Sequence, residues 1–390
     1  MIIELNNDSL TELKTYIKDC SAILKDTNNA IFYFNIENQK LEFYTQSVTS
    51  LTKFECHADF YSLDDNEYFV VNMKKFFAAI SKASNNIKFI YTDNILTFSY
   101  PDNNKSKIEV STSDEITKQE IEEIRNNFIS ADSRYFKLFE NYKTVKITNE
   151  LLSFVKYVKK YSSILNISNA VSIESKNILK YSDNVSIISK TTKDEICAED
   201  IYVSLNIFDA CNSLFGTKID ELLISEDEKW VKVNYNNDYT MTAFLYMQDV
   251  KFQSPSEDDI NYVCPDENNK VTLKFDKLSF RNMMELFDDI FDSTWQFKIA
   301  NFESIENNMA KFTHIDESTN AESYLVCSEV NNYENAGFYI PLDVIKDIIE
   351  CSNSEEFTLE YSDIYVGEEH GSFVNLYSDD IKSHICKVDV

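Results

Sequence analysis

The segment Ile2–Cys20, IIELNNDSLTELKTYIKDC, joins an extended run to an amphipathic helix, and this pattern returns twice in the chain. The second copy is Val145–Ser162, VKITNELLSFVKYVKKYS, and the third is Val271–Asp289, VTLKFDKLSFRNMMELFDD. Short alternating or β-branched runs follow each copy, and such runs are typical of strands joined by Asn and Asp turns. The copies lie roughly one domain length apart, so the repeat decides the fold.

Each repeat then continues with a second strand and helix. These are the segments Tyr68–Ala83, Ile201–Phe215 and Phe338–Glu350, and further strands follow them. The order β-α-β-β-β followed by β-α-β-β-β, three times over, predicts an α+β protein whose helices cover one face of antiparallel sheets. We expect domains at 1–130, 131–260 and 261–390, with boundaries in the charged or polar stretches near 125–142 and 253–268.

Composition excludes several classes of protein. The chain has 390 residues, of which 43% are hydrophobic, so it can build several cores and is not a disordered acidic tail. Its eight cysteines are scattered without a CxxC spacing, which is typical of reduced, buried thiols inside the cell. The sequence shows no apolar stretch of about 18 residues, so we expect a soluble cytoplasmic protein that does not span a membrane.

The sequence carries no motif for catalysis. A chain with four glycines contains no Walker loop, GxSxG or GxGxxG pattern. Cys56 and His57 are neighbours, and the other histidines, at 314, 370 and 384, lack metal-ligand spacing. Acidic clusters such as Asp64–Asp65 fall in predicted turns without the spacing of a calcium loop. We therefore expect no enzymatic activity, no metal and no cofactor.

Three local matches connect the sequence to a known family. They are the extended start that enters a helix at Ile2–Cys20, the run Asn72–Phe77 (NMKKFF), and the run Tyr262–Pro265 (YVCP) before the third repeat. In this order and spacing they resemble the DNA sliding clamps of the three-domain bacterial type, the β subunit of DNA polymerase III. The resemblance covers nearly the whole chain.

The resemblance implies a function as well as a fold. It implies three repeated DNA-clamp domains per chain, with sheets outside and two helices per domain inside, and two chains joined head to tail in a ring around duplex DNA. Such a ring slides on DNA and tethers DNA polymerase, with a clamp loader as a further partner. The alternative is an acidic protein-interaction module on the same fold that does not encircle DNA, such as a decoy or a virion component.

The net charge of −29 at first argues against a nucleic-acid partner, so the charge has to be mapped along the chain. In the first helix an apolar stripe is expected to face the core, and it consists of Leu10, Leu13, Ile17, Cys20 and Leu24. Basic residues of the helices lie off such stripes, and by the resemblance they would face DNA. This set comprises Lys14, Lys18, Lys25, Lys74, Lys75, Lys82, Lys156, Lys159, Lys160 and Arg281. The alternative for each residue is an ordinary solvated side chain.

The opening lysines of the second helix illustrate the expected division of labour. Phe76 and Phe77 should anchor that helix to the sheet, while Lys74 and Lys75 turn toward phosphate. The third repeat departs from this pattern, because Arg281 is accompanied by Glu285, Asp288 and Asp289, and Lys346 by Asp347 and Glu350. Either DNA contacts mainly the first two repeats, or the third repeat has another role.

Family clamps also hold partner peptides in an apolar pocket between the second and third domains. The resemblance places its walls at Tyr181, Val185, Ile187, Pro265, Val388 and Val390. The C-terminus, ICKVDV, lacks the methionine and proline that are usual there. The peptide preference is therefore expected to differ from the usual bacterial one, as it would if a phage or other virus supplies its own polymerase. For the strand residues at 181, 185 and 187 the alternative is simple alternating packing.

Overall fold

The computed structural model describes residues 2–61, 67–83, 87–92, 95–99, 107–111, 116–165, 168–183, 186–215, 218–236, 239–252, 270–290, 299–305, 308–315, 320–331, 338–366 and 369–386. Two compact units make up the chain. Unit 1 contains Met1–Thr148 and Asn206–Asp249, and unit 2 contains Asn149–Leu205 and Val250–Val390. Every pair of neighbouring strands in the sheets is antiparallel, which confirms the α+β class. The two boundaries between the three domains expected from the sequence stay a prediction.

The order of elements repeats three times. The first repeat contains β1 (Ile2–Leu5), α1 (Asn7–Asp19), α2 (Ser21–Leu24), β2 (Asn29–Asn35), β3 (Lys40–Gln46), β4 (Ser50–His57), β5 (Asp59–Tyr61), β6 (Glu67–Asn72), α3 (Met73–Ile80), β7 (Ile87–Thr92), β8 (Ile95–Ser99) and β9 (Lys107–Ser111). The second contains β10 (Tyr142–Lys146), α6 (Asn149–Leu165), β11 (Ala170–Glu174), β12 (Ile178–Ser182), β13 (Ser186–Thr191), β14 (Ile201–Ser204), α7 (Leu205–Ala210), β15 (Glu221–Ser225), β16 (Trp230–Asn236) and β17 (Thr240–Tyr246).

The third repeat contains β18 (Val271–Asp276), α9 (Lys277–Ile290), β19 (Ile299–Ile305), β20 (Met309–Ile315), β21 (Asn320–Val326), β22 (Glu329–Asn331), β23 (Phe338–Pro341), α10 (Leu342–Cys351), β24 (Glu356–Val366), β25 (Glu369–Tyr377) and β26 (Ile381–Cys386). Apart from α2 and the short strands β5 and β22, each repeat reads β-α-β-β-β-β-α-β-β-β. This order confirms the threefold repeat expected from the sequence.

The strands of each repeat divide between two sheets, and the sheets run across the repeats. In unit 1 an eight-stranded sheet has the order β10-β15-β16-β17-β4-β3-β2-β6, and a five-stranded sheet has the order β5-β1-β7-β8-β9. In unit 2 a nine-stranded sheet has the order β14-β11-β12-β13-β26-β25-β24-β18-β22, and a four-stranded sheet has the order β21-β20-β19-β23. The repeats are therefore joined by strand pairing at β4 with β17 and at β13 with β26.

Aromatic side chains attach the helices of unit 1 to their sheets. Phe76 of α3 is fully buried, with its ring centroid 4.7 Å from that of Phe32 and 5.9 Å from that of Phe98. These partners belong to different sheets, so Phe76 closes the core between them. Its anchoring role is confirmed, whereas Phe77 is only half-buried.

The first helix differs in detail from its predicted stripe. Tyr16 is fully buried, with its ring stacked 4.6 Å from Phe54, while Ile17 is only half-buried. The helix also ends at Asp19, and Leu24 belongs to the separate helix α2. Leu10, Leu13, Cys20 and Leu24 are buried as predicted, and Tyr16 takes the place in the core that was expected for Ile17.

Most of the cysteines follow the sequence expectation. The six whose side chains the structure describes, Cys20, Cys56, Cys197, Cys211, Cys327 and Cys351, are free and buried. Burial raises the pKa of the Cys211 thiol to about 12, so this group stays protonated at neutral pH.

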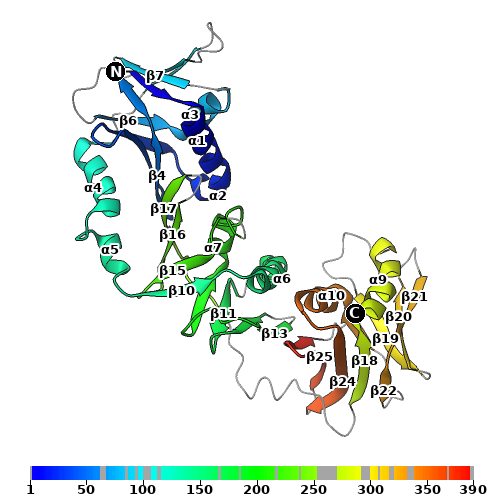
Figure 1. Ribbon diagram of the computed structural model, residues 1–390. Helices are drawn as coiled ribbons and strands as arrows, with labels where there is room; N and C mark the ends of the chain where they lie inside the picture. The colour runs from blue at the N-terminus through cyan, green and yellow to red at the C-terminus, as the bar shows by residue number, and fades with distance from the viewer. Residues whose placement is uncertain are drawn as a thin grey trace. The chain divides into compact units, whose positions relative to one another are not determined.

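Two helices that the sequence analysis missed, α4 (Lys118–Ile129) and α5 (Arg134–Leu138), follow the first repeat. Ile121, Ile124 and Phe128 of α4 turn to the eight-stranded sheet. The domain boundary expected near this region stays a prediction. Figure 1 shows α4 and α5 on one side of strands β4 and β17, with α1 and α2 on the other. A capping box starts α4, because the Thr117 side chain accepts from the Glu120 backbone and Glu120 bonds back.

A buried ion pair fastens α4 to the sheet. Glu42 is 3% exposed, and its carboxylate accepts from the Tyr44 hydroxyl and, at 3.1 Å, from the Asn35 amide. The Arg125 Nε lies 3.4 Å from the same carboxylate, and its guanidinium stacks 4.1 Å from the Tyr33 ring centroid. Arg125 thus supplies the cation that a buried carboxylate requires.

We expect Arg125→Ala to lower the free energy of unfolding by about 3 kcal/mol, because it leaves the Glu42 carboxylate buried without its cation. Urea denaturation measures this change. The matched control is Lys118→Ala on the exposed face of the same helix, which should stay within about 0.5 kcal/mol of the wild type. Equal losses in the two variants would show that Arg125 does not stabilise α4 through Glu42.

Candidate nucleic-acid and partner interfaces

The basic residues of α1, α2 and α3 lie at the surface of unit 1. Five of the six are exposed and form no ion pair with any residue that the structure describes: Lys18, Lys25, Lys74, Lys75 and Lys82. Lys14 differs, because it is half-buried and its Nζ donates to the Ala83 carbonyl. Lys82 lies in the turn after α3, and the segment Met73–Lys82 contains no acidic residue.

The basic residues of α6 in unit 2 are in a different electrostatic setting. Lys156 is exposed, Lys159 is half-buried, and Lys160 forms an ion pair with Asp347 of α10. The Tyr161 hydroxyl donates to the same Asp347 Oδ2 at 2.6 Å. Burial raises the pKa of Tyr161, and the Asp343 and Asp347 carboxylates raise it further, so this hydroxyl stays protonated and can donate.

Two cations of α9 and α10 are held by carboxylates in the same way as Lys160. Arg281 of α9 forms a two-pronged contact with Glu350 of α10, with Nε–Oε1 at 2.7 Å and Nη2–Oε2 at 2.6 Å. Lys346 of α10 lies 2.5 Å from Asp288 of α9. The Arg281 hydrogen bonds lower the pKa of Glu350, so the pair is fully charged at neutral pH.

Helices α6 and α10 enclose a cavity of about 420 Å³. Its lining combines both charges and consists of Ser153, Lys156, Tyr157, Lys160, Asp347, Glu350 and Cys351. Because the acidic side chains face the basic ones across it, the cavity has no net excess of cations for an anionic ligand.

The partner-pocket residues fall into two groups. Val185, Pro265, Val388 and Val390 lie outside the described residues. Ile187 of β13 is half-buried and is the register partner of His384 on β26, so the second repeat and the C-terminal strand do meet there. Tyr181 is 1% exposed, and its ring packs edge to face on Tyr157 at 6.5 Å. That placement suits the packing alternative for Tyr181.

His384 adds a polar group beside Ile187 that the sequence analysis did not select. Its Nδ1 lies 2.8 Å from Asn375 Oδ1, and the Asn375 side chain is fully buried. Burial lowers the pKa of His384, and nearby Lys382 lowers it further, so the ring is neutral at pH 7. Only the strand pairing could have revealed this neighbour, since 197 residues separate the two positions in the sequence.

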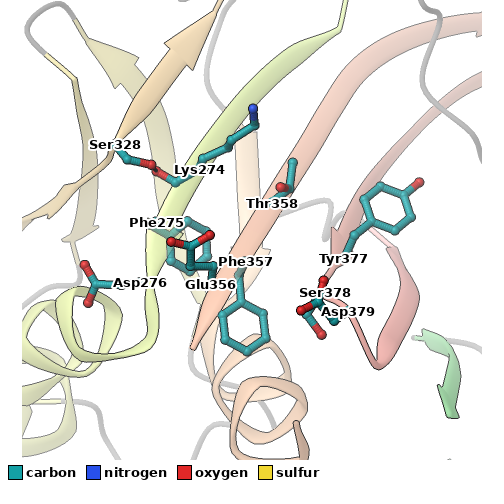
Figure 2. A pocket seen from close by; sticks show the side chains of 10 residues that line it. All are labelled: Lys274, Phe275, Asp276, Ser328, Glu356, Phe357, Thr358, Tyr377, Ser378 and Asp379. Carbon is teal, nitrogen blue, oxygen red and sulfur yellow. Dashed lines mark hydrogen bonds between the residues drawn. The ribbon is translucent and has the colours of Figure 1, made fainter. Parts of the chain in front are cut away.

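A second cavity, of about 380 Å³, lies at the ends of β18 and β24 (Figure 2). Two of its charged side chains have partners within the protein. Lys274 pairs with Glu329 at 2.5 Å, and Asp276 accepts from the backbone and hydroxyl of Ser279 at the start of α9.

The described part of the chain shows no group of three or more His, Cys, Asp and Glu residues placed to hold a metal ion. Within the same residues, every helix is too short or too polar to cross a membrane.

Comparison with known proteins identifies the fold. No protein-family model matches the chain, and no curated protein sequence matches it. Solved bacterial clamps do match, each over 100% of both chains. The Helicobacter pylori β clamp in complex with 5-chloroisatin has a TM-score of 0.67 at 13% identity, and that clamp bound to a DNA ligase peptide has 0.65 at 14%. The DNA polymerase III β chain from Streptococcus pneumoniae has 0.64 at 13%. The chain therefore has the β-clamp fold, as the resemblance in sequence implied.

Proposed function

We propose that this protein is a DNA sliding clamp: a ring of two chains that encircles duplex DNA and tethers a DNA polymerase to it. The role is non-enzymatic and depends on topology and on exchangeable contacts with replication proteins. The fold supports this proposal, and the observation that carries it is the rule by which the strands of successive repeats pair.

The strand pairing between successive repeats follows one rule, and by this rule one strand at each end of the series has no partner in another repeat within the described chain. The last strand of the β2–β4 run pairs with the last strand of the second repeat, β17, and the corresponding strand β13 pairs with β26 of the third repeat. By the same rule β21 should pair with the last strand of a first repeat, which is β9. Both β9 and β21 are edge strands of their sheets. An edge strand is a template for pairing, so a second copy would satisfy both edges by joining head to tail.

Exposed apolar side chains on β21 favour this use of the edge. Tyr324 is 46% exposed and Val326 is 60% exposed, at alternate positions of the strand and hence on one face. Such side chains are the usual core of an interface. Pairing of β21 with β9 twice would close a ring of six domains, each close to the expected ranges 1–130, 131–260 and 261–390.

The mass of the protein in solution tests closure. Light scattering at micromolar concentration should find a species of two chains. A single chain would favour the alternative, an acidic interaction module on the clamp fold that does not encircle DNA.

Duplex DNA and a clamp loader are the partners that the ring requires. In this proposal the DNA-facing set is Lys14, Lys18, Lys25, Lys74, Lys75, Lys82, Lys156, Lys159, Lys160 and Arg281. Lysine suits a sliding surface because it is a mobile point charge, without the two-pronged geometry that fixes a register on DNA. The exposed lysines of unit 1 support the assignment most directly.

The polymerase would be held through a short peptide. A similar clamp was solved with a DNA ligase peptide, which supports a peptide site of this kind. We propose Ile187, where β13 pairs with β26, as the described member of this site. The resemblance also assigns Val185, Pro265, Val388 and Val390 to it, whereas the burial of Tyr181 suits a packing role.

Ile187→Ala should weaken binding of the polymerase's clamp-binding peptide by about 2 kcal/mol, the size of a hot-spot contact. Deletion of 386–390 should abolish it without dissociating the ring. Fluorescence anisotropy measures both effects. Tyr202→Ala on β14, an edge strand of the same sheet, is the control and should bind as the wild type does. Unchanged affinity in both variants would place the peptide site elsewhere.

A further inference from the structure

The helices of the two units treat their cations differently. In unit 1 the segment Met73–Lys82 carries three lysines and no acid. In unit 2 the helix α10 carries Asp343, Asp347 and Glu350 against Lys346 alone. Carboxylates are therefore concentrated on α10, which contacts α6 and α9, and both of these helices carry cations.

Contacts show where these carboxylates go. Asp347 forms an ion pair with Lys160 of α6, and Glu350 forms one with Arg281 of α9. A third ion pair joins Asp288 of α9 to Lys346 of α10, so here the carboxylate belongs to α9 and the cation to α10. Three cations on three helices are thus each held by a carboxylate of a neighbouring helix.

In these pairs the carboxylates occupy positions that a phosphate group could also take. The guanidinium of Arg281 meets Glu350 through two parallel hydrogen bonds at 2.7 and 2.6 Å, the arrangement an arginine adopts with a phosphate group. Asp347 accepts from Lys160 and from the Tyr161 hydroxyl on the same oxygen, as a phosphate oxygen can. A DNA phosphate that approached these cations would have to displace a carboxylate already in place.

We propose that Asp347, Glu350 and Asp288 mask Lys160, Arg281 and Lys346 from DNA, so that phosphate contact rests mainly on the exposed lysines outside these pairs, which are Lys156 and the lysines of unit 1. The inference rests on the proposed function, because it assigns to helices that would face DNA a set of carboxylates that lowers the affinity for DNA. Masking keeps the grip weak and non-specific, and a weak grip lets a ring slide. Asp288, Asp347 and Glu350 set the strength of DNA contact without touching DNA themselves.

The test neutralises the three carboxylates with near-isosteric amides: Asp288→Asn, Asp347→Asn and Glu350→Gln together. Affinity for a short random-sequence duplex is measured across a range of salt concentrations. Each cation released to phosphate adds about 0.9 to the slope of log affinity against log salt, so three should steepen it by about 2.7. Affinity at low salt should rise in parallel, and thermal melting checks that the fold is kept.

A matched control separates masking from overall charge. Glu37→Gln, Glu123→Gln and Glu226→Gln change the net charge by the same amount at exposed positions of unit 1. These substitutions should leave the slope within error of the wild type. Equal steepening in both triple variants, or no change in the first, would overturn the masking role.

The outcome is separable from that of the proposed function. Short duplexes bind by surface contact alone, whereas a closed ring is detected by retention on DNA with blocked ends. If the triple variant shows a steeper salt dependence of its affinity for short duplexes, and the wild type is not retained on blocked DNA, the inference is supported and the ring is rejected. Retention without any change of slope would do the reverse.

Discussion

Replacing Tyr324 and Val326 together by aspartate is expected to convert a species of two chains into single chains. Both side chains are exposed on the edge strand β21, so the substitutions cost little in folding the chain itself. In the ring they place charges at the centre of a β-sheet junction that closes each interface, and buried unpaired charge opposes association strongly. Light scattering of wild type and variant measures the change directly.

The control uses edges that the pairing rule does not employ. Tyr142 on β10 and Tyr202 on β14 are 54% and 39% exposed and lie on edge strands of the other two sheets. Tyr142→Asp with Tyr202→Asp should leave two chains associated. Should the control dissociate and the β21 variant stay paired, the closing edges would have been assigned to the wrong strands.

Reversal of six exposed lysines to glutamate should nearly remove the affinity for DNA. These are Lys18, Lys25, Lys74, Lys75, Lys82 and Lys156, which form no ion pair with the described residues. If each contacts one phosphate, the salt slope should flatten by about 5, and affinity at low salt should fall by roughly a thousandfold or more. Their exposure predicts little loss of stability, which thermal melting would verify.

Six lysines on other surfaces provide the comparison: Lys118, Lys137, Lys146, Lys193, Lys229 and Lys251, all exposed. Reversing them makes the same change in net charge, so it reports the general repulsion of DNA by an acidic protein. A much smaller effect is expected. Similar losses in the two sets would mean that α1, α2, α3 and α6 carry no special DNA surface.

The threefold order of elements could be predicted because it depends on local patterns. Each repeat opens with the same extended run and amphipathic helix, and Phe76 stands where an apolar anchor must face the sheet. The joining of β4 to β17 and of β13 to β26 could not be predicted in this way. Strand partners far apart in the sequence are chosen by tertiary packing, which single-chain periodicity does not encode.

The helix α4 shows how a readable signal was obscured. Thr117 and Glu120 form a capping box, and Ile121, Ile124 and Phe128 follow at helical spacing. Dense charge between them gave the stretch the composition of a boundary. The structure shows that the charge belongs to the outer face and to Arg125, which reaches the buried Glu42.

In the candidate site, too, features set by local spacing could be predicted, whereas contacts between separate elements could not. Exposure of the lysines on α1 and α3 follows from helical spacing, and the structure agrees for Lys18, Lys74 and Lys75. The bonds of Lys14 with Ala83 and of Lys160 with Asp347 arise between separate elements, so spacing alone could not anticipate them. The same limit applies to His384 beside Ile187.

Retention on DNA with blocked ends tests the central claim most directly. The protein is incubated with a linear duplex biotinylated at both ends, streptavidin is added to block them, and high salt then removes contacts held only by charge. A closed ring should remain on the blocked duplex, and cleavage by a restriction enzyme at its centre should release it. Loss of the protein in high salt before cleavage, or persistence after it, would contradict a sliding ring.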